Sequence, residues 1–343
     1  MLNTLIQKAV IWPLIWLGAV FYLKSGKQAR WIFEKIRTPR SLYLTARNMI
    51  HFHLGIPRIA GWISMTIEPA AVCNLTCEYC ARGKDKNWTG ARPTFMDWAL
   101  FTKIIDEAPR SIETVCLAGI GEPLMHPRII DMIEYASNSG RLVYMFSNGT
   151  LLEGELLERL AASPLDVLNV SIEPDVESAR RYRGVEYDEV AENVRAFAAR
   201  KGPGQTLNLA LVMNEMHEDR ICRFEEEWRA IVDHVKISPQ MGLGAVDSDI
   251  SKQACSELWR GNMDIKTNGN ISVCCFDSLE DLTVGNAATD NLNEVINHTA
   301  LHTLLQRVAT GDLPERCRRC TSACFTRKDI ARMTQKAANR RQQ

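Results

Sequence analysis

The sequence predicts an α/β protein: a partial (β/α)6 barrel of the TIM type, followed by a small cysteine-rich domain and preceded by an apolar helical segment. From residue 64 onward, short runs rich in β-branched residues alternate with segments of helical periodicity. Most of the eleven cysteines fall into two groups, within residues 73–80 and 255–324. Residues 1–60 carry nine Lys or Arg and one acid, although the formal net charge of the whole chain is zero.

These features divide the chain into four expected parts. Residues 1–60 form a membrane-associating basic and apolar segment, residues 61–240 the barrel, residues 241–326 the cysteine-rich domain and residues 327–343 a basic tail. With 343 residues, of which 46% are hydrophobic, the chain is long enough to bury a large core.

The N-terminal segment contains an uncharged run, Ala9 to Leu23, between Lys8 and Lys24. A bilayer span needs about 20 apolar residues, and Pro13 interrupts this shorter run. We therefore expect a helix lying in the cytoplasmic leaflet, with the following basic residues on anionic lipid. A true span, or a helix packed on the protein itself, is the alternative.

Eleven cysteines without a cleavable signal peptide indicate a reducing compartment and metal ligation rather than disulfides. The expected location is the cytoplasm, at the periphery of the membrane. No nucleic-acid partner is expected.

The barrel strands are expected at residues 64–70, 114–119, 142–148, 166–173, 206–213 and 234–239. A capping box, Thr94 to Asp97, should begin the first barrel helix. Two later helices have periodic apolar faces, one from Tyr187 to Phe197 and one from Ile221 to Ile231. In such barrels the functional groups lie on loops at the carboxyl ends of the strands.

Directly after the first expected strand, Cys73, Cys77 and Cys80 have a C-x3-C-x2-C spacing. Three soft thiolate ligands on one short loop suit a 4Fe-4S cluster, and they leave one of its four irons open. An open metal position can bind a small chelating molecule. A zinc site and a set of buried thiols are the alternatives, but zinc usually takes four protein ligands.

This spacing, with the aromatic Tyr79 before the third cysteine, resembles the signature of the radical S-adenosylmethionine (SAM) enzymes. The resemblance implies that SAM chelates the open iron and is cleaved reductively to a 5′-deoxyadenosyl radical, which abstracts hydrogen from a substrate. It also implies the same partial barrel and a reductant such as flavodoxin or ferredoxin.

Further motifs support the resemblance. Gly119 to Pro123 is similar to the family's G-G-E-P motif, with Ile120 as a departure, and Ser147-Asn148-Gly149 is similar to its T-N-G segment. A guanidinium can bind a carboxylate in a bidentate manner, which suits Arg183 to the methionyl carboxylate of SAM. By this resemblance the expected SAM contacts are Tyr79, Gly119, Gly121, Glu122, Pro123, Ser147, Asn148, Ser171, Arg183 and Asn214.

The second cysteine group resembles the auxiliary-cluster domains called SPASM and, in a shorter form, twitch. A hairpin over residues 265–273, turning at Asn268-Gly269, should bring distant cysteines together. The expected ligands of one auxiliary 4Fe-4S cluster are Cys255, Cys274, Cys317 and Cys320, with Cys324 or Cys275 as substitutes. A zinc knuckle is the alternative. With four protein ligands, the cluster would transfer electrons rather than bind substrate.

Three functions remain open from the sequence. The apolar N-terminus favours hydrogen abstraction from a lipid or another lipophilic small molecule. Maturation of a ribosomally made peptide is the second hypothesis, because relatives often modify such peptides. A non-catalytic iron–sulfur electron carrier or binding protein is the third.

Overall fold

The computed structural model describes residues 38–80, 92–213, 220–239, 255–277, 280–318 and 320. The predicted apolar run, the basic tail, Asn214 and Cys324 lie outside these residues.

Six parallel strands follow one another in chain order across the sheet, and they confirm the predicted barrel. The strands are β1 (Ser64–Ile67), β2 (Thr114–Leu117), β3 (Leu142–Ser147), β4 (Val167–Ser171), β5 (Thr206–Met213) and β6 (His234–Pro239). Their alternate residues, such as Val115, Met145 and Leu168, are buried in one continuous apolar core. All six strands therefore present their carboxyl ends at one edge of the sheet.

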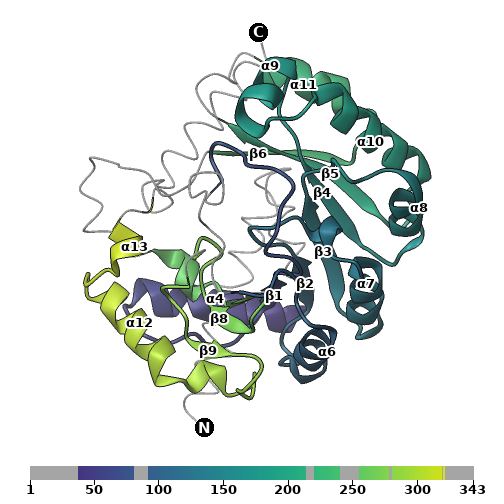
Figure 1. Ribbon diagram of the computed structural model, residues 1–343. Helices are drawn as coiled ribbons and strands as arrows, with labels where there is room; N and C mark the ends of the chain where they lie inside the picture. The colour runs from purple at the N-terminus through teal and green to yellow at the C-terminus, as the bar shows by residue number, and fades with distance from the viewer. Residues whose placement is uncertain are drawn as a thin grey trace.

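Helices cover the outer side of this curved sheet (Figure 1). They are α6 (Trp98–Glu107), α7 (Ile129–Asn138), α8 (Gly154–Ala162), α10 (Tyr187–Arg200) and α11 (Ile221–Trp228). The predicted apolar faces are the buried ones, as Phe101 in α6, Phe197 in α10 and Trp228 in α11 show. Shorter helical turns follow β2 and β4, at η3 (Pro123–Met125), α9 (Val176–Ser178) and η4 (Ala179–Arg183).

The predicted capping box before α6 is wrong in its cap residue. Asp97 is the N-cap, and its carboxylate accepts hydrogen bonds from the amides of Ala99 (2.8 Å) and Leu100 (3.3 Å). Thr94 lies in extended chain instead, where its carbonyl accepts from the amide of Ala71 at 2.8 Å. The segment before α6 is thus held to the loop after β1.

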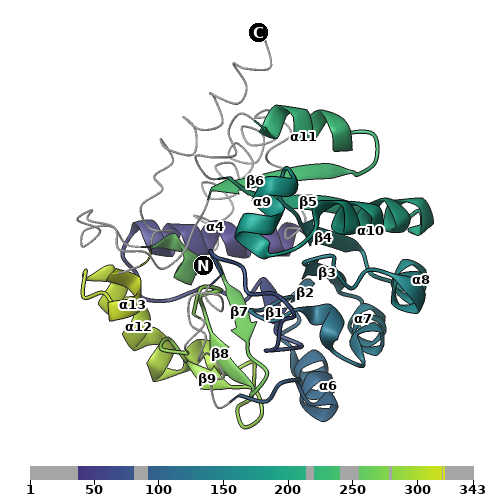
Figure 2. The ribbon, with the colours of Figure 1, turned by 45° about the horizontal axis from the view of Figure 1, so that its top comes forward.

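The second domain continues the same sheet. Strand β7 (Asn262–Ile265) pairs in parallel with β1, so that Met65 lies opposite Met263, and β8 (Asn270–Ser272) and β9 (Gly285–Asn286) follow antiparallel. The β7–β8 connection confirms the predicted hairpin. Gly269 turns it with a φ of 86°, which favours glycine. Helices α12 (Thr299–Ala309) and α13 (Glu315–Arg318), with the short turns η6 (Ser256–Trp259) and η7 (Val295–Asn297), complete the domain (Figure 2).

Helix α4 (Pro39–His53) precedes the barrel and packs on the second domain, where Phe52 lies 5.5 Å from Trp259 between ring centroids. Asn48 fixes the chain that leaves this helix, because its amide donates to the carbonyl of Gly61 at 3.0 Å. Within the described residues, none of the helices has both the length and the apolar character needed to span a bilayer.

Candidate functional site

The three cysteines of the predicted cluster motif lie on the loop after β1, at the carboxyl edge of the sheet. The pKa of the Cys77 thiol is raised to about 11, chiefly by burial; Arg183 opposes this rise, and Cys80 and Cys73 contribute to it. The thiols are therefore close enough to repel one another as thiolates. Such a set is stabilised when cationic iron binds it, so these residues fit a cluster.

Asparagine side chains hold the start of this loop. The amide of Asn148, at the end of β3, donates to the Asn74 carbonyl oxygen at 2.8 Å and approaches the Cys73 sulfur at 3.8 Å. Asn74 in turn donates to the Thr150 hydroxyl at 2.7 Å. The predicted residue Asn148 is thus placed beside the first thiol.

The loop's other end is held by a buried ion pair. Arg183 Nε lies 2.8 Å from Glu173 Oε1, and both side chains are almost fully buried. The Tyr79 hydroxyl donates to the same carboxylate oxygen, while the amide of Glu78 donates to the Tyr182 carbonyl at 2.8 Å. The predicted residues Tyr79 and Arg183 therefore meet around Glu173.

Charges around Arg183 keep it cationic. Burial alone would lower the pKa of this guanidinium, but its electrostatic interactions with the acidic groups of Tyr79, Glu173 and Cys77 outweigh that effect and raise it. A fixed cation beside the cysteine loop suits a carboxylate ligand as well as Glu173.

The Glu122 carboxylate is enclosed by the protein. Oε1 accepts from the Ser147 hydroxyl (2.8 Å) and the Leu124 amide (3.1 Å), and Oε2 accepts from the Asn148 amide (2.7 Å). Burial raises its pKa, although these hydrogen bonds oppose the rise. Glu122 thus joins the loops after β2 and β3, and the hydrogen bond from Ser147 is part of this connection.

The glycines before Glu122 are required by close backbone approach. A Cβ on Gly121 would lie 2.1 Å from the Ala70 carbonyl oxygen, and one on Gly119 would lie 2.3 Å from Glu68 Cγ. Pro123 is buried at the start of η3. The backbone of this loop therefore runs against the chain that leads into Cys73.

Ser171 is the last residue of β4, opposite Ala210 of β5, and it is half-buried. It lies at the same edge of the sheet as the cysteine loop. Of the predicted SAM contacts, Asn214 alone lies outside the described residues.

The second set of thiols assembles from three segments of the cysteine-rich domain. Burial raises the pKa of Cys255 to about 12 and that of Cys317 to about 11, and negative charge on Cys320 contributes to both shifts. Burial also raises the pKa of Cys274, with contributions from Cys275, Cys255 and Cys320. The four predicted ligands thus lie near one another, whereas the Cys275 side chain is exposed.

Among the described residues, no three or more His, Cys, Asp or Glu side chains are arranged to hold a single metal ion. A cubane places a different requirement on its ligands, because each thiolate binds its own iron and the thiols need only surround a common space. Within each set the thiols lie close enough to affect one another's pKa, as ligands of one cluster must.

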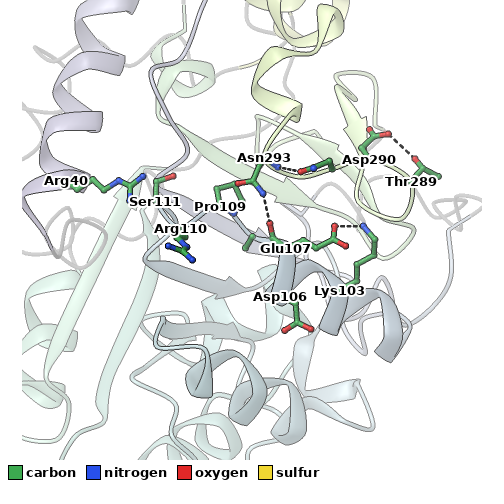
Figure 3. Close-up of a pocket in the computed structure, with 12 residues that line it drawn as sticks. Arg40, Lys103, Asp106, Glu107, Pro109, Arg110, Ser111, Thr289, Asp290 and Asn293 are labelled. Carbon is green, nitrogen blue, oxygen red and sulfur yellow. Dashed lines mark hydrogen bonds and ion pairs between the residues drawn. The ribbon is translucent and has the colours of Figure 1, made fainter.

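A pocket of about 910 Å³ lies elsewhere (Figure 3). Its residues 106–111 lead into the amino end of β2, at the edge of the sheet opposite the cysteine loop. Lys103 of α6 donates to the Ala287 carbonyl at 2.8 Å, and Asn293 donates to the Glu107 carbonyl at 3.2 Å. These contacts join α6 to the second domain, and none of the predicted site residues lines the pocket.

Two buried acids have roles in the site that were not predicted from the sequence. Glu173 binds both Tyr79 and Arg183, and Glu68 accepts a hydrogen bond from the Ile120 amide at 3.0 Å. Each acid follows an apolar strand. A single carboxylate at the end of such a strand is the sequence feature that could have identified both as site residues.

Comparison with protein families matches residues 67–227 to the radical SAM superfamily and residues 255–321 to the SPASM iron–sulfur cluster-binding domain.

Among curated proteins, the chain is 35% identical over 109 residues to the tungsten-containing aldehyde ferredoxin oxidoreductase cofactor-modifying protein of Pyrococcus furiosus, covering 31% of this chain and 30% of that protein. It is 27% identical over 199 residues to the AdoMet-dependent heme synthase of Methanosarcina barkeri, covering 57% and 54%. It is 23% identical over 186 residues to the PqqA peptide cyclase of Gluconobacter oxydans, covering 54% and 48%. The chain therefore spans only about a third to a half of the length of these relatives.

Among solved structures, the fold resembles SuiB of Streptococcus suis bound to precursor peptide SuiA, with a TM-score of 0.56 and 15% identity over 76% of this chain and 70% of that chain. SuiB bound to S-adenosylmethionine gives the same TM-score. At this identity the likeness concerns the fold alone.

Proposed function

Because this chain belongs to the radical SAM superfamily and carries a SPASM domain behind the barrel, we propose that it is an enzyme that matures a peptide by abstracting hydrogen from one of its carbon atoms. The two domains indicate a 4Fe-4S cluster that binds SAM and an auxiliary iron–sulfur cluster. The convergence of three thiols with the motif loops at one edge of the sheet is the observation that supports radical SAM chemistry most directly.

We assign the first cluster to Cys73, Cys77 and Cys80. When bound, the cluster and SAM supply an electron and the hydrogen-abstracting group. Arg183 is a cation fixed by Glu173 and provides the electrostatic attraction for the SAM carboxylate. The enclosed Glu122 holds the loops in place, and the backbone carbonyls beside it receive the SAM ammonium group.

We assign the auxiliary cluster to Cys255, Cys274, Cys317 and Cys320, so that it has four thiolate ligands and no open position. Its residues belong to the domain whose strand β7 pairs with β1, directly before the cysteine loop. This continuity gives the cluster a fixed position relative to the barrel, which suits transfer of an electron from a substrate. The boundaries 61–240 and 241–326 remain our proposal for the two domains.

Peptide maturation is preferred over the lipid substrate that the N-terminal sequence favours. The similarity to PqqA peptide cyclase, over 54% of this chain, supports a peptide substrate. A lipophilic small molecule is the second candidate, because the similarity to AdoMet-dependent heme synthase covers 57% of the chain at 27% identity.

The first test is anaerobic reconstitution of the full chain, followed by chromatography for 5′-deoxyadenosine after addition of SAM and reductant. A fully loaded protein that forms none would support the non-catalytic carrier instead. Peptides and metabolites from cells making the wild type or Cys77→Ala then separate the substrates. A peptide mass change that depends on Cys77 supports maturation, and a change confined to a small lipophilic metabolite supports the second candidate.

We also propose that residues 1–37 attach the enzyme to the cytoplasmic face of the membrane. Six of these residues are Lys or Arg and one is acidic, and they include the uncharged run 9–23. Flotation with anionic vesicles tests this for the full chain and for a chain beginning at Thr38, the N-cap of α4. Equal recovery of both with the vesicles would contradict the proposal.

A further inference from the structure

Glu68 occupies the junction of three elements. It follows β1 directly and is 1% exposed. Its Oε1 accepts a hydrogen bond from the Ile120 amide at 3.0 Å, within the loop from Gly119 to Gly121. Its own amide donates to the Ile265 carbonyl of β7 at 2.9 Å. One residue therefore contacts both the motif loop and the auxiliary domain.

The other oxygen of this carboxylate continues the connection through an arginine. Glu68 Oε2 lies 3.0 Å from Arg92 Nη1, and Arg92 Nε lies 2.9 Å from Glu280 Oε1 in the auxiliary domain. The exposed fractions of the three side chains are 1%, 4% and 16%. Buried charges are costly unless they are paired, so breaking either pair disturbs both domains.

Glu280 has an unusual backbone conformation. With a φ of 63° it is the one non-glycine residue at positive φ in the described part of the chain. This conformation is unfavourable for a residue with a Cβ, and it persists where surrounding contacts enforce it. The carboxylate of Glu280 accepts from Asn268 at 2.9 Å and from Asn270, both on the β7–β8 hairpin. The hairpin and Arg92 together thus hold this residue in place.

Gly119 leaves the space for this arrangement. A Cβ at position 119 would lie 2.3 Å from Cγ and 2.7 Å from Oε1 of Glu68. The Glu68 side chain therefore fills the space that a side chain at position 119 would need, and it packs directly on the motif loop.

We propose that Glu68 is a positioning residue that couples the binding of SAM at the Gly119–Gly121 loop to the docking of the auxiliary domain, through Arg92 and Glu280. This inference rests on the proposed function, because it takes SAM as the ligand of the loop. Coupling is reciprocal: a docked hairpin strengthens SAM binding, and bound SAM strengthens hairpin docking by the same factor. Binding of SAM in the barrel would thereby also stabilise the docked position of the β7–β8 hairpin in the auxiliary domain.

The test uses the full chain loaded anaerobically with its clusters. Calorimetry gives the Kd for SAM, and hydrogen–deuterium exchange of residues 262–272 is measured with and without SAM. In the wild type we expect SAM to slow exchange in this hairpin. In Arg92→Met we expect the Kd to rise about 5-fold or more and the slowing to disappear. The control Arg200→Met breaks an exposed pair with Glu158 and should leave both readouts unchanged.

If Arg92→Met does not fold, Glu280→Gln gives the same comparison, because it removes one charge from the connection and keeps the side-chain shape. If a folded variant, Arg92→Met or Glu280→Gln, keeps both the SAM affinity and the hairpin protection of the wild type, the inference is wrong but the proposed function is unaffected. The same conclusion follows if the wild type binds SAM without any change in hydrogen–deuterium exchange of the hairpin. A fully loaded wild type that does not bind SAM would overturn the proposed function as well.

Discussion

The cysteine loop takes its three thiols from eight consecutive residues, 73–80, whereas the auxiliary set takes its four from residues 255, 274, 317 and 320. The first set is defined by local spacing and is held in place by side chains that follow β3 and β4 in the chain. The second set exists only because the hairpin and α13 bring three segments together. A 4Fe-4S cluster with three thiolate ligands keeps one iron open to another ligand, whereas a cluster with four thiolate ligands has no open iron.

Replacing Cys77 should have the largest effect, because it removes a central ligand from the set that has none to spare. For Cys77→Ala we expect loss of 5′-deoxyadenosine formation and of roughly half of the bound iron. Chromatography and iron analysis measure both quantities. Cys222→Ala is the control, since Cys222 is exposed on α11, away from either set. Retained SAM cleavage in Cys77→Ala would place the chemistry elsewhere.

Replacing Cys274 tests the other side of the comparison. Cys274→Ala should lose the auxiliary cluster and product formation, while SAM cleavage without substrate continues at the first cluster. Electron paramagnetic resonance of the reduced protein measures the cluster loss. The neighbouring Cys275→Ala should behave as the wild type, because the Cys275 side chain is exposed. If only Cys275→Ala loses the cluster, our ligand assignment is wrong.

Glu173 tests how the cysteine loop is held. Glu173→Gln removes the charge that pairs with buried Arg183, and breaking a buried pair costs about 3–5 kcal/mol. Urea denaturation measures this loss in the free energy of unfolding. Glu186→Gln, which breaks the exposed pair with Arg180, is the matched control and should change little. Equal stability of the two variants would mean that the buried pair does not secure the loop.

The smallest expected effect is on the pH dependence of stability, and it comes from His126 in the barrel rather than from the auxiliary cysteines. His126 Nε2 donates to the Met96 carbonyl and Nδ1 accepts from the Arg128 amide, so the folded protein holds the neutral ring. Burial lowers its pKa in the folded state. The folded protein therefore binds fewer protons, and its stability should fall as pH decreases below about 6.5.

Urea denaturation at several pH values measures this fall, and His126→Gln should weaken the dependence. His53→Gln, at the exposed end of α4, should keep the wild-type dependence. An identical pH dependence in His126→Gln and the wild type would contradict the prediction.

The sequence by itself determined the order of the barrel elements, the spacing of Cys73, Cys77 and Cys80 and the hairpin turn at Gly269, because each depends on neighbours within a few residues. It also predicted the auxiliary cluster ligands, although by resemblance to a known domain rather than by local pattern. Only the tertiary structure decided that β7 extends the barrel sheet beside β1. It likewise decided that Glu173, Arg183 and Tyr79 meet, and that Glu68 joins the two domains. Those contacts join residues far apart in the chain, and the partner of a buried charge depends on which surfaces pack together rather than on local sequence.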